Sequence, residues 1–193
     1  YFLTSNSQFR PAPPPAFGSP AFNTDLNEVL TRTQNITAQE LAFARYWDFP
    51  AGTPTPIGYW NGVAAGYVAQ RDMDERAAAQ VFSLMHAAMF DALIGCWEAK
   101  YHYWLLRPSQ ANPSISLAFT LPNFPSYPSG HSCSSSSAAR VLTHFFPDRA
   151  TGRLEFRDSG VFSGECFLSC HGVDHSPKRY PEMPALGAPA RRM

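Results

Sequence analysis

Apolar residues recur at intervals of three and four along most of the chain, the spacing that places them on one face of a helix. The pattern predicts a first helix from Asn23 and a second that opens at a capping box, Thr37 to Glu40, and continues to Trp47. A third, short helix is expected near residues 59–70. Because no alternating strand pattern and no internal repeat are visible, the sequence predicts an all-α helical bundle.

The widest apolar stripe predicts a central core helix. It begins at Asp72, with Glu75 three residues on, and runs to about Lys100. Its small residues favour close packing of a neighbouring helix, and the stripe comprises Ala78, Val81, Phe82, Met85, Ala88, Met89, Ala92 and Leu93. A last helix is expected to start near Gly130 and to continue through the serine run, with an apolar face of Ala138, Val141, Leu142, Phe145 and Phe146.

Proline content divides the chain into three parts. Residues 1–22 are too rich in proline for a helix and predict an extended arm that docks on the surface. Residues 23–170 form the helical domain. Residues 171–193 have several prolines and no amphipathic period, which predicts an irregular tail.

Composition excludes some partners. Fifteen basic and fifteen acidic side chains cancel, so the balance of charge favours neither nucleic acid nor a membrane surface. The apolar stretches are shorter than the roughly 20 residues of a membrane-spanning helix, which predicts a soluble chain without a membrane span. The four cysteines form neither a dense disulfide framework nor a repeated zinc pattern, and no signal peptide is visible, so the compartment stays open, with export possible for a longer form.

Two cations stand out near the end of the core helix. Lys100 and Arg107 are seven residues apart, which on a continuous helix brings both to one face, roughly 10 Å apart along the axis. Two such side chains can converge on one small anion. The alternative is a pair of solvated cations, which the helix macrodipole favours at a C-terminus.

The tetrapeptide PSGH, residues 128–131, offers a partner for these cations. Ser129 supplies a hydroxyl, Gly130 lets its backbone N–H approach a ligand closely, and His131 titrates near neutrality. Together they stand at a predicted helix N-terminus, which favours anions. The pattern therefore indicates a site rather than a linker.

Lys-x6-Arg-Pro followed by Pro-Ser-Gly-His resembles the first two signature motifs of the type 2 phosphatidic acid phosphatase and vanadium-dependent haloperoxidase superfamily. The segments SQFRPAPPPAFGS, RTQNITAQELAFARYW and WEAKYHYWLLRP look like its soluble, bacterial haloperoxidase-like branch, so the resemblance covers most of residues 1–150. It implies an α-helical bundle with a pocket for phosphate or the isosteric vanadate. The implied substrates are a phosphoester, or a halide with peroxide.

The resemblance also implies roles for individual residues. Lys100 and Arg107 would neutralise the equatorial oxygens of the anion, Ser129 and the Gly130 N–H would hydrogen-bond it, and His131 would be the catalytic acid or base. The two motifs do not separate phosphatase from haloperoxidase, and the upstream segments favour the haloperoxidase-like branch.

The third family motif, Ser-Arg-x5-His-x3-Asp, is degenerate here. Its best match begins at Ser159, with Gly160 in place of Arg, Cys166 in place of the nucleophilic or vanadium-ligating His, and Cys170 in place of Asp. The family's closing helix is also expected to be missing. The loss predicts impaired chemistry, with reversible oxyanion binding in place of a covalent anchor.

Three functions therefore stay open. The first is an enzyme with residual phosphatase or haloperoxidase activity, and the second is a catalytically dead, oxyanion-binding or truncated remnant of the same fold. The third is a metal-binding segment formed by Cys166, Cys170, His171 and His175, whose like residues are four apart. That arrangement lacks a loop between the pairs, so no metal ligand is assigned from it.

Overall fold

The computed structural model describes residues 2–50, 52–147, 156–158 and 164–166. Their secondary structure is helical except for one short antiparallel strand pair, which confirms the all-α prediction. The elements are α1 (Pro20–Gln34), α2 (Ala38–Asp48), α3 (Thr55–Gln70), α4 (Glu75–Tyr103), α5 (Pro108–Ala111), α6 (Gly130–Phe145), β1 (Phe156–Asp158) and β2 (Gly164–Cys166).

Side-chain caps set the start of α1, α2, α4 and α6. The capping box predicted at Thr37 and Glu40 is confirmed, with both reciprocal hydrogen bonds present. α1 begins three residues earlier than predicted, because Ser19 caps it and accepts a hydrogen bond from the N–H of Phe22. The core helix begins later than predicted, because Asp74 rather than Asp72 is its N-cap.

The turn before α4 explains that difference. Asp74 Oδ1 accepts a hydrogen bond of 2.7 Å from the N–H of Ala77. Asp72 has a φ of 46°, a left-handed conformation that aspartate tolerates better than most residues and that no helix N-cap adopts. Either aspartate has a cap-forming side chain, and the sequence alone does not distinguish them.

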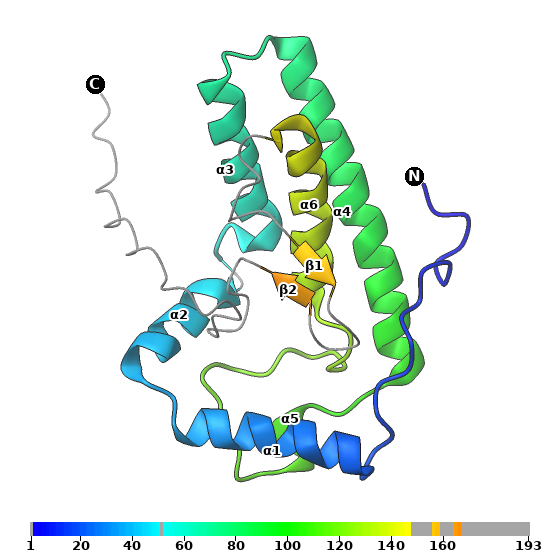
Figure 1. Cartoon of the computed structure of the whole chain (residues 1–193), viewed down its shortest axis with the longest axis vertical. Helices are drawn as coiled ribbons and strands as arrows, with labels where there is room; N and C mark the ends of the chain where they lie inside the picture. Colours follow the sequence, from blue (N-terminus) through cyan, green and yellow to red (C-terminus); the bar gives the residue numbers. More distant parts are fainter. Residues whose placement is uncertain (1, 51, 148–155, 159–163, 167–193) are drawn as a thin grey trace.

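Helices α3, α4 and α6 lie side by side and enclose the core, while α1 runs roughly at right angles to them below their lower ends (Figure 1). The predicted apolar stripes of α4 and α6 both face inward. The buried core comprises Trp60, Ala64, Val81, Met85, Met89, Ala138, Ala139, Leu142 and Phe146. Ser135 accepts a hydrogen bond of 3.1 Å from the indole N–H of Trp60, so this polar atom is satisfied inside the core.

The N-terminal segment before α1 runs alongside α4 and packs against it (Figure 1). Its prolines prevent a helix, so its backbone groups find partners on other elements. The contacts are a hydrogen bond from Phe2 N to Asp91 Oδ2 (2.6 Å), an ion pair of Arg10 with Glu98, and hydrogen bonds from the hydroxyls of Tyr103 to Pro11 O (2.6 Å) and of Tyr127 to Ala12 O (2.9 Å).

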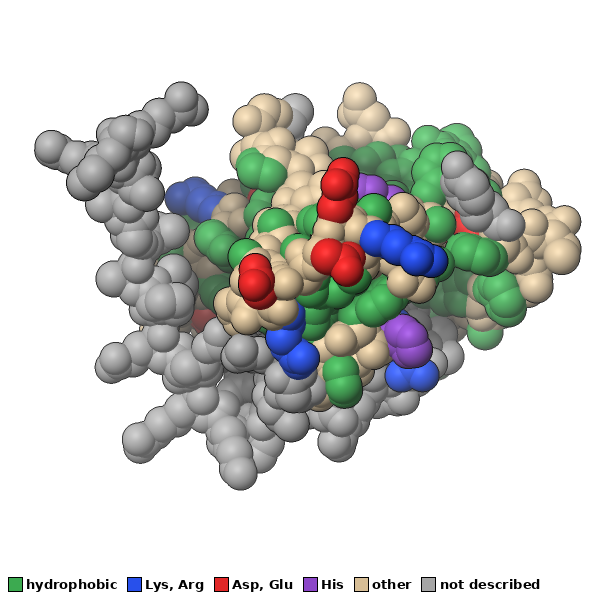
Figure 2. Space-filling view, turned by 90° about the horizontal axis from the view of Figure 1, so that it is seen from above, with side chains coloured by type: hydrophobic (Ala, Val, Ile, Leu, Met, Phe, Trp, Pro, Cys, Tyr) green, Lys and Arg blue, Asp and Glu red, His purple; other side chains and the backbone are tan. Residues whose placement is uncertain are grey.

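The length of the apolar segment corrects one prediction. Within the described chain, the segment from Glu75 to Ala111 is long and apolar enough to cross a membrane by length and composition. The sequence argument that no apolar stretch reaches this length was therefore wrong. The core helix of a soluble protein has the same composition, and α4 contributes Val81 and Met85 to the core. The face of the bundle seen from above mixes acidic, basic and apolar side chains (Figure 2).

Leu142→Ala tests the core. Leu142 is fully buried on α6, so we expect its truncation to lower the free energy of unfolding by about 2–5 kcal/mol. Leu117→Ala removes the same atoms from a side chain that is 53% exposed, and its effect should stay below about 0.5 kcal/mol. Urea unfolding followed by circular dichroism measures both. Equal effects for the two variants would contradict this core.

Candidate oxyanion site

Lys100 and Arg107 do not lie on one helix. The last helical residue of α4 is Tyr103, and Trp104 adopts a left-handed conformation with φ 50° and ψ 40°. Arg107 follows this turn and is the N-cap of α5. The prediction that the two cations share a helix face was therefore wrong, because seven-residue spacing fixes a common face only where the helix continues.

The two cations nevertheless meet at one turn, residues 124–126. The Lys100 ammonium donates hydrogen bonds to the carbonyls of Pro125 (2.8 Å) and Ser126 (3.2 Å). Arg107 donates from both Nε (3.1 Å) and Nη2 (2.9 Å) to the carbonyl of Phe124. The Phe124 ring also lies under both charges, 4.9 Å from Lys100 Nζ and 5.0 Å from Arg107 Cζ.

Burial makes Lys100 an unusual cation. Its residue exposure is 1%, although lysine is rarely buried without a charged partner. Burial, and after it the charge of Arg107, lowers the pKa of Lys100 to about 8. Burial also lowers the pKa of Arg107, which stays charged. Among the described residues neither cation has a carboxylate partner, so carbonyl dipoles and the Phe124 ring, rather than a negative charge, compensate the two positive charges.

PSGH forms the start of α6, immediately after this turn. Ser129 is the N-cap, and its hydroxyl oxygen accepts a hydrogen bond of 3.3 Å from the N–H of Ser132. Gly130 is the first helical residue, and a β-carbon there would lie 3.0 Å from the ring of Trp97 on α4. Glycine therefore lets α6 begin directly against α4. The positive end of the α6 dipole lies at Ser129 and Gly130.

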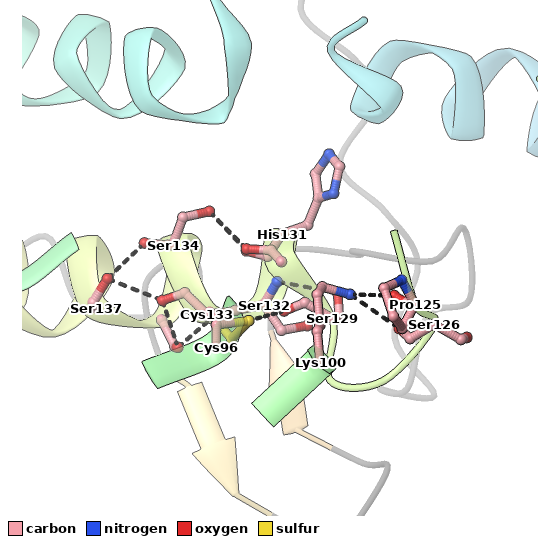
Figure 3. The surroundings of a disulfide bond; sticks show 12 residues. Cys96, Lys100, Pro125, Ser126, Ser129, His131, Ser132, Cys133, Ser134 and Ser137 are labelled. Atoms are coloured by element: carbon pink, nitrogen blue, oxygen red, sulfur yellow. Dashed lines mark hydrogen bonds between the residues drawn. A yellow bond between two sulfur atoms is a disulfide. The ribbon is translucent and has the colours of Figure 1, made fainter. Parts of the chain in front are cut away.

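The ring of His131 points away from Lys100 and Ser129 (Figure 3). It stacks on Phe49 at the end of α2, with centroids 6.5 Å apart and planes at 16°. Its Nε2 is buried, and within the described part of the chain it has no hydrogen-bond partner. The structure therefore brings together Lys100, Arg107 and the residues that begin α6, while the imidazole lies on another side of the helix.

Phe49 also lines an apolar groove of about 460 Å³. It runs between α2 and α3 and is lined by Tyr46, Phe49, Pro54, Gly58, Tyr59, Gly62 and Val63. Neither Lys100 nor Arg107 lines it. The groove is thus separate from the turn where the cations converge.

The third-motif positions are only partly described. Gly160 and Cys170 lie outside the described residues. Cys166 lies on strand β2, opposite Phe156 of β1, and this strand contacts α6. The metal-binding alternative assumed a helix through Cys166, which the strand contradicts, and its other three residues lie outside the described part. The described residues contain no group of three or more His, Cys, Asp or Glu that could hold a metal ion.

A disulfide between Cys96 and Cys133 links α4 to the first turns of α6 (Figure 3). Sequence reasoning missed it, because neither cysteine belongs to a pattern that specifies pairing. The two cysteines are 37 residues apart in the sequence. Closing a loop of that length lowers the conformational entropy of the unfolded chain, which stabilises the fold by about 4 kcal/mol. Cys96 Sγ also lies 3.7 Å from the Ser129 carbonyl oxygen, a contact without a hydrogen bond because an oxidised cysteine has no proton to donate.

No protein-family model and no curated protein matches the sequence. Among solved structures, the chain is similar to a crystal structure described as the first bacterial vanadium-dependent iodoperoxidase, with a TM-score of 0.70 and 34% sequence identity. The chain has a haloperoxidase-like fold. The match covers 75% of this chain and 39% of that protein, so the chain spans well under half of the iodoperoxidase. The haloperoxidase-like fold confirms the predicted architecture, while the anion-binding roles and the degenerate motif stay predictions.

The buried lysine predicts an unusual dependence of stability on pH. The pKa of Lys100 is about 8 in the folded chain, below the value of about 10.4 for an unperturbed lysine. The unfolded chain therefore binds more protons between these values, and stability rises with pH across that window. Relative to Lys100→Met, the free energy of unfolding should rise by on the order of 2 kcal/mol between pH 8 and pH 10.

Urea unfolding at several pH values measures this difference. Lys100→Arg is the matched control, because arginine stays protonated throughout the window and should show no such rise relative to Lys100→Met. Parallel profiles for the wild type and both variants would show that Lys100 titrates normally.

Proposed function

We propose that the protein binds a tetrahedral oxyanion, vanadate or phosphate, reversibly beside the turn that leads into α6. The observation that carries the proposal is the convergence of Lys100 and Arg107 on residues 124–126 with no carboxylate among their described partners. Burying two like charges together is costly. A bound anion would offset that cost.

Both cations keep hydrogen-bond donors for such a ligand. A lysine ammonium has three N–H donors, and Lys100 uses two of them on carbonyls. A guanidinium has five, and Arg107 uses two on Phe124. The remaining donors, with the Ser129 hydroxyl and the Gly130 N–H at the α6 N-terminus, would hold the oxyanion without displacing the carbonyls.

The hydrogen-bond donors of this site fit an anion held by non-covalent contacts better than an anion bonded to a protein side chain. Bound vanadate would supply a metal centre for halide oxidation by peroxide, the chemistry that the name of the similar iodoperoxidase indicates. Cys166 stands where the family's anchoring histidine belongs, so charge and hydrogen bonds alone would hold the anion here. His131 would need another rotamer to hold a proton near the anion, because its ring now stacks on Phe49. Its Nε2 has no hydrogen-bond partner among the described residues, so that rotation would break no described hydrogen bond of this atom.

Isothermal titration calorimetry with inorganic phosphate, and separately with micromolar orthovanadate, tests the proposal at pH 7. Removing one charge-assisted contact costs about 1.5–3 kcal/mol, so Lys100→Ala or Arg107→Ala should each weaken binding by about 10-fold to 150-fold. The double variant should show no saturable binding. Arg107→Lys keeps the charge but loses the planar fork, and we expect a loss of about tenfold.

Arg76→Ala removes an exposed arginine from the start of α4 and is the matched control, with affinity unchanged. Wild-type affinity should also fall as the pH rises above 8, where Lys100 loses its proton. Binding that survives in the double variant would refute the proposed site.

A triple variant, Gly160→Arg, Cys166→His and Cys170→Asp, separates a damaged enzyme from a remnant. The substitutions restore the family's third motif, and we expect peroxide-dependent iodide oxidation with vanadate, or phosphomonoester hydrolysis, to rise at least tenfold above the wild type. Both activities are measured by steady-state assays. The triple variant with Lys100→Ala is the control and should lose the gain. An inactive triple variant that still binds phosphate would favour the catalytically dead remnant.

A further inference from the structure

The disulfide of Cys96 and Cys133 lies beside the proposed oxyanion site. Cys96 is one helical turn before Lys100 on α4, and Cys133 is two residues after His131 on α6 (Figure 3). The N–H of Cys133 donates a hydrogen bond of 3.0 Å to the carbonyl of Ser129, the α6 N-cap. The bond therefore ties the turn that carries Lys100 to the helix start that carries Ser129 and Gly130.

Electrostatics oppose that arrangement. Burial, and after it the like charge of Arg107, lowers the pKa of Lys100, and the positive end of the α6 dipole lies at Ser129 and Gly130 nearby (Figure 3). Two contacts act against the repulsion: the packing of Trp97 on Gly130, and the hydrogen bonds that Lys100 donates to carbonyls. Each is non-covalent and weak enough to break and re-form. The covalent bond is the constraint that repulsion does not overcome.

The two sulfurs differ in access. Cys96 is 3% exposed, whereas Cys133 is half-buried. Cys133 is therefore the more accessible of the two cysteines for attack by a thiolate. The dithiol gives two electrons and two protons, the S–S bond breaks to leave two cysteine thiols, and the dithiol closes to its own disulfide.

We propose that the Cys96–Cys133 disulfide is a redox-controlled clamp that holds the start of α6 in its anion-binding position, and that reduction by a dithiol releases it. This inference rests on the proposed oxyanion site and adds its regulation. Oxidised protein binds the anion with a pre-formed donor set, whereas reduced protein must first reassemble that set.

Two measurements on the full chain test the clamp. The first is titration with inorganic phosphate, because dithiols reduce vanadate. The second is amide hydrogen exchange at residues 133–136, the first amides with helical hydrogen bonds in α6, which reports opening of α6 without any ligand. Reduced wild type and Cys96→Ala/Cys133→Ala should both bind phosphate at least tenfold more weakly than oxidised wild type. Exchange at these amides should be at least tenfold faster.

Cys166→Ala/Cys170→Ala is the matched control. It keeps the clamp, so it should respond to the dithiol like the wild type, whereas Cys96→Ala/Cys133→Ala should not respond. Circular dichroism checks that each variant is folded, and reduced wild type provides the same comparison without substitution.

The outcomes are distinguishable. Unchanged exchange on reduction overturns the clamp, whatever the anion binding. Faster exchange with equal phosphate affinity overturns the regulation of the site. Faster exchange with no phosphate binding in either form refutes the proposed function itself, and with it the regulatory role, leaving a structural disulfide.

Discussion

The burial of Lys100 against the carbonyls of residues 124–126 is the constraint on which this end of the molecule depends. Lys100 is 1% exposed, and its ammonium donates to two carbonyls of one turn. Those bonds fix the chain directly before α6, and Arg107 fixes the same turn from its other side. A buried cation needs such dipoles, because no described carboxylate compensates it. The start of α6 is thereby held beside two positive charges.

Close packing of α6 on α4 makes that burial possible, and the serine run provides it. Small side chains let the two helices approach, and a glycine at position 130 accommodates Trp97. Serine hydroxyls are satisfied within the helix by hydrogen bonds to carbonyls three and four residues back. Ser134 and Ser135 are buried, so the run contributes small side chains to the packed face of α6. Their contribution to the proposed site is indirect, because they bring Ser129 and Gly130 next to Lys100.

Sequence periodicity predicted the helices well and the site only in part. The apolar stripes of α4 and α6 identified buried residues such as Met85 and Leu142, since burial of a helix face requires that spacing. The seven-residue spacing of Lys100 and Arg107 led to a wrong prediction of a shared helix face, because the helix ends between them at the left-handed residue Trp104. The cations still meet, through tertiary contacts with a turn that local pattern cannot place. The disulfide likewise has no local signal, because its pairing depends on how α4 and α6 pack.

The same geometry separates binding from chemistry. The donors on Lys100, Arg107 and the α6 N-terminus are groups that attract and orient an oxyanion. Among the described residues, the His131 ring stacks on Phe49 and does not face Lys100 (Figure 3), and the sequence predicts that Cys166 takes the position of the superfamily's histidine. Electrostatic attraction needs only charges and dipoles in roughly the right place, whereas catalysis needs a nucleophile and a proton carrier at specific atoms. A chain that kept the first two motifs and lost the third, as the sequence predicts here, would therefore retain the basis for binding without the basis for turnover.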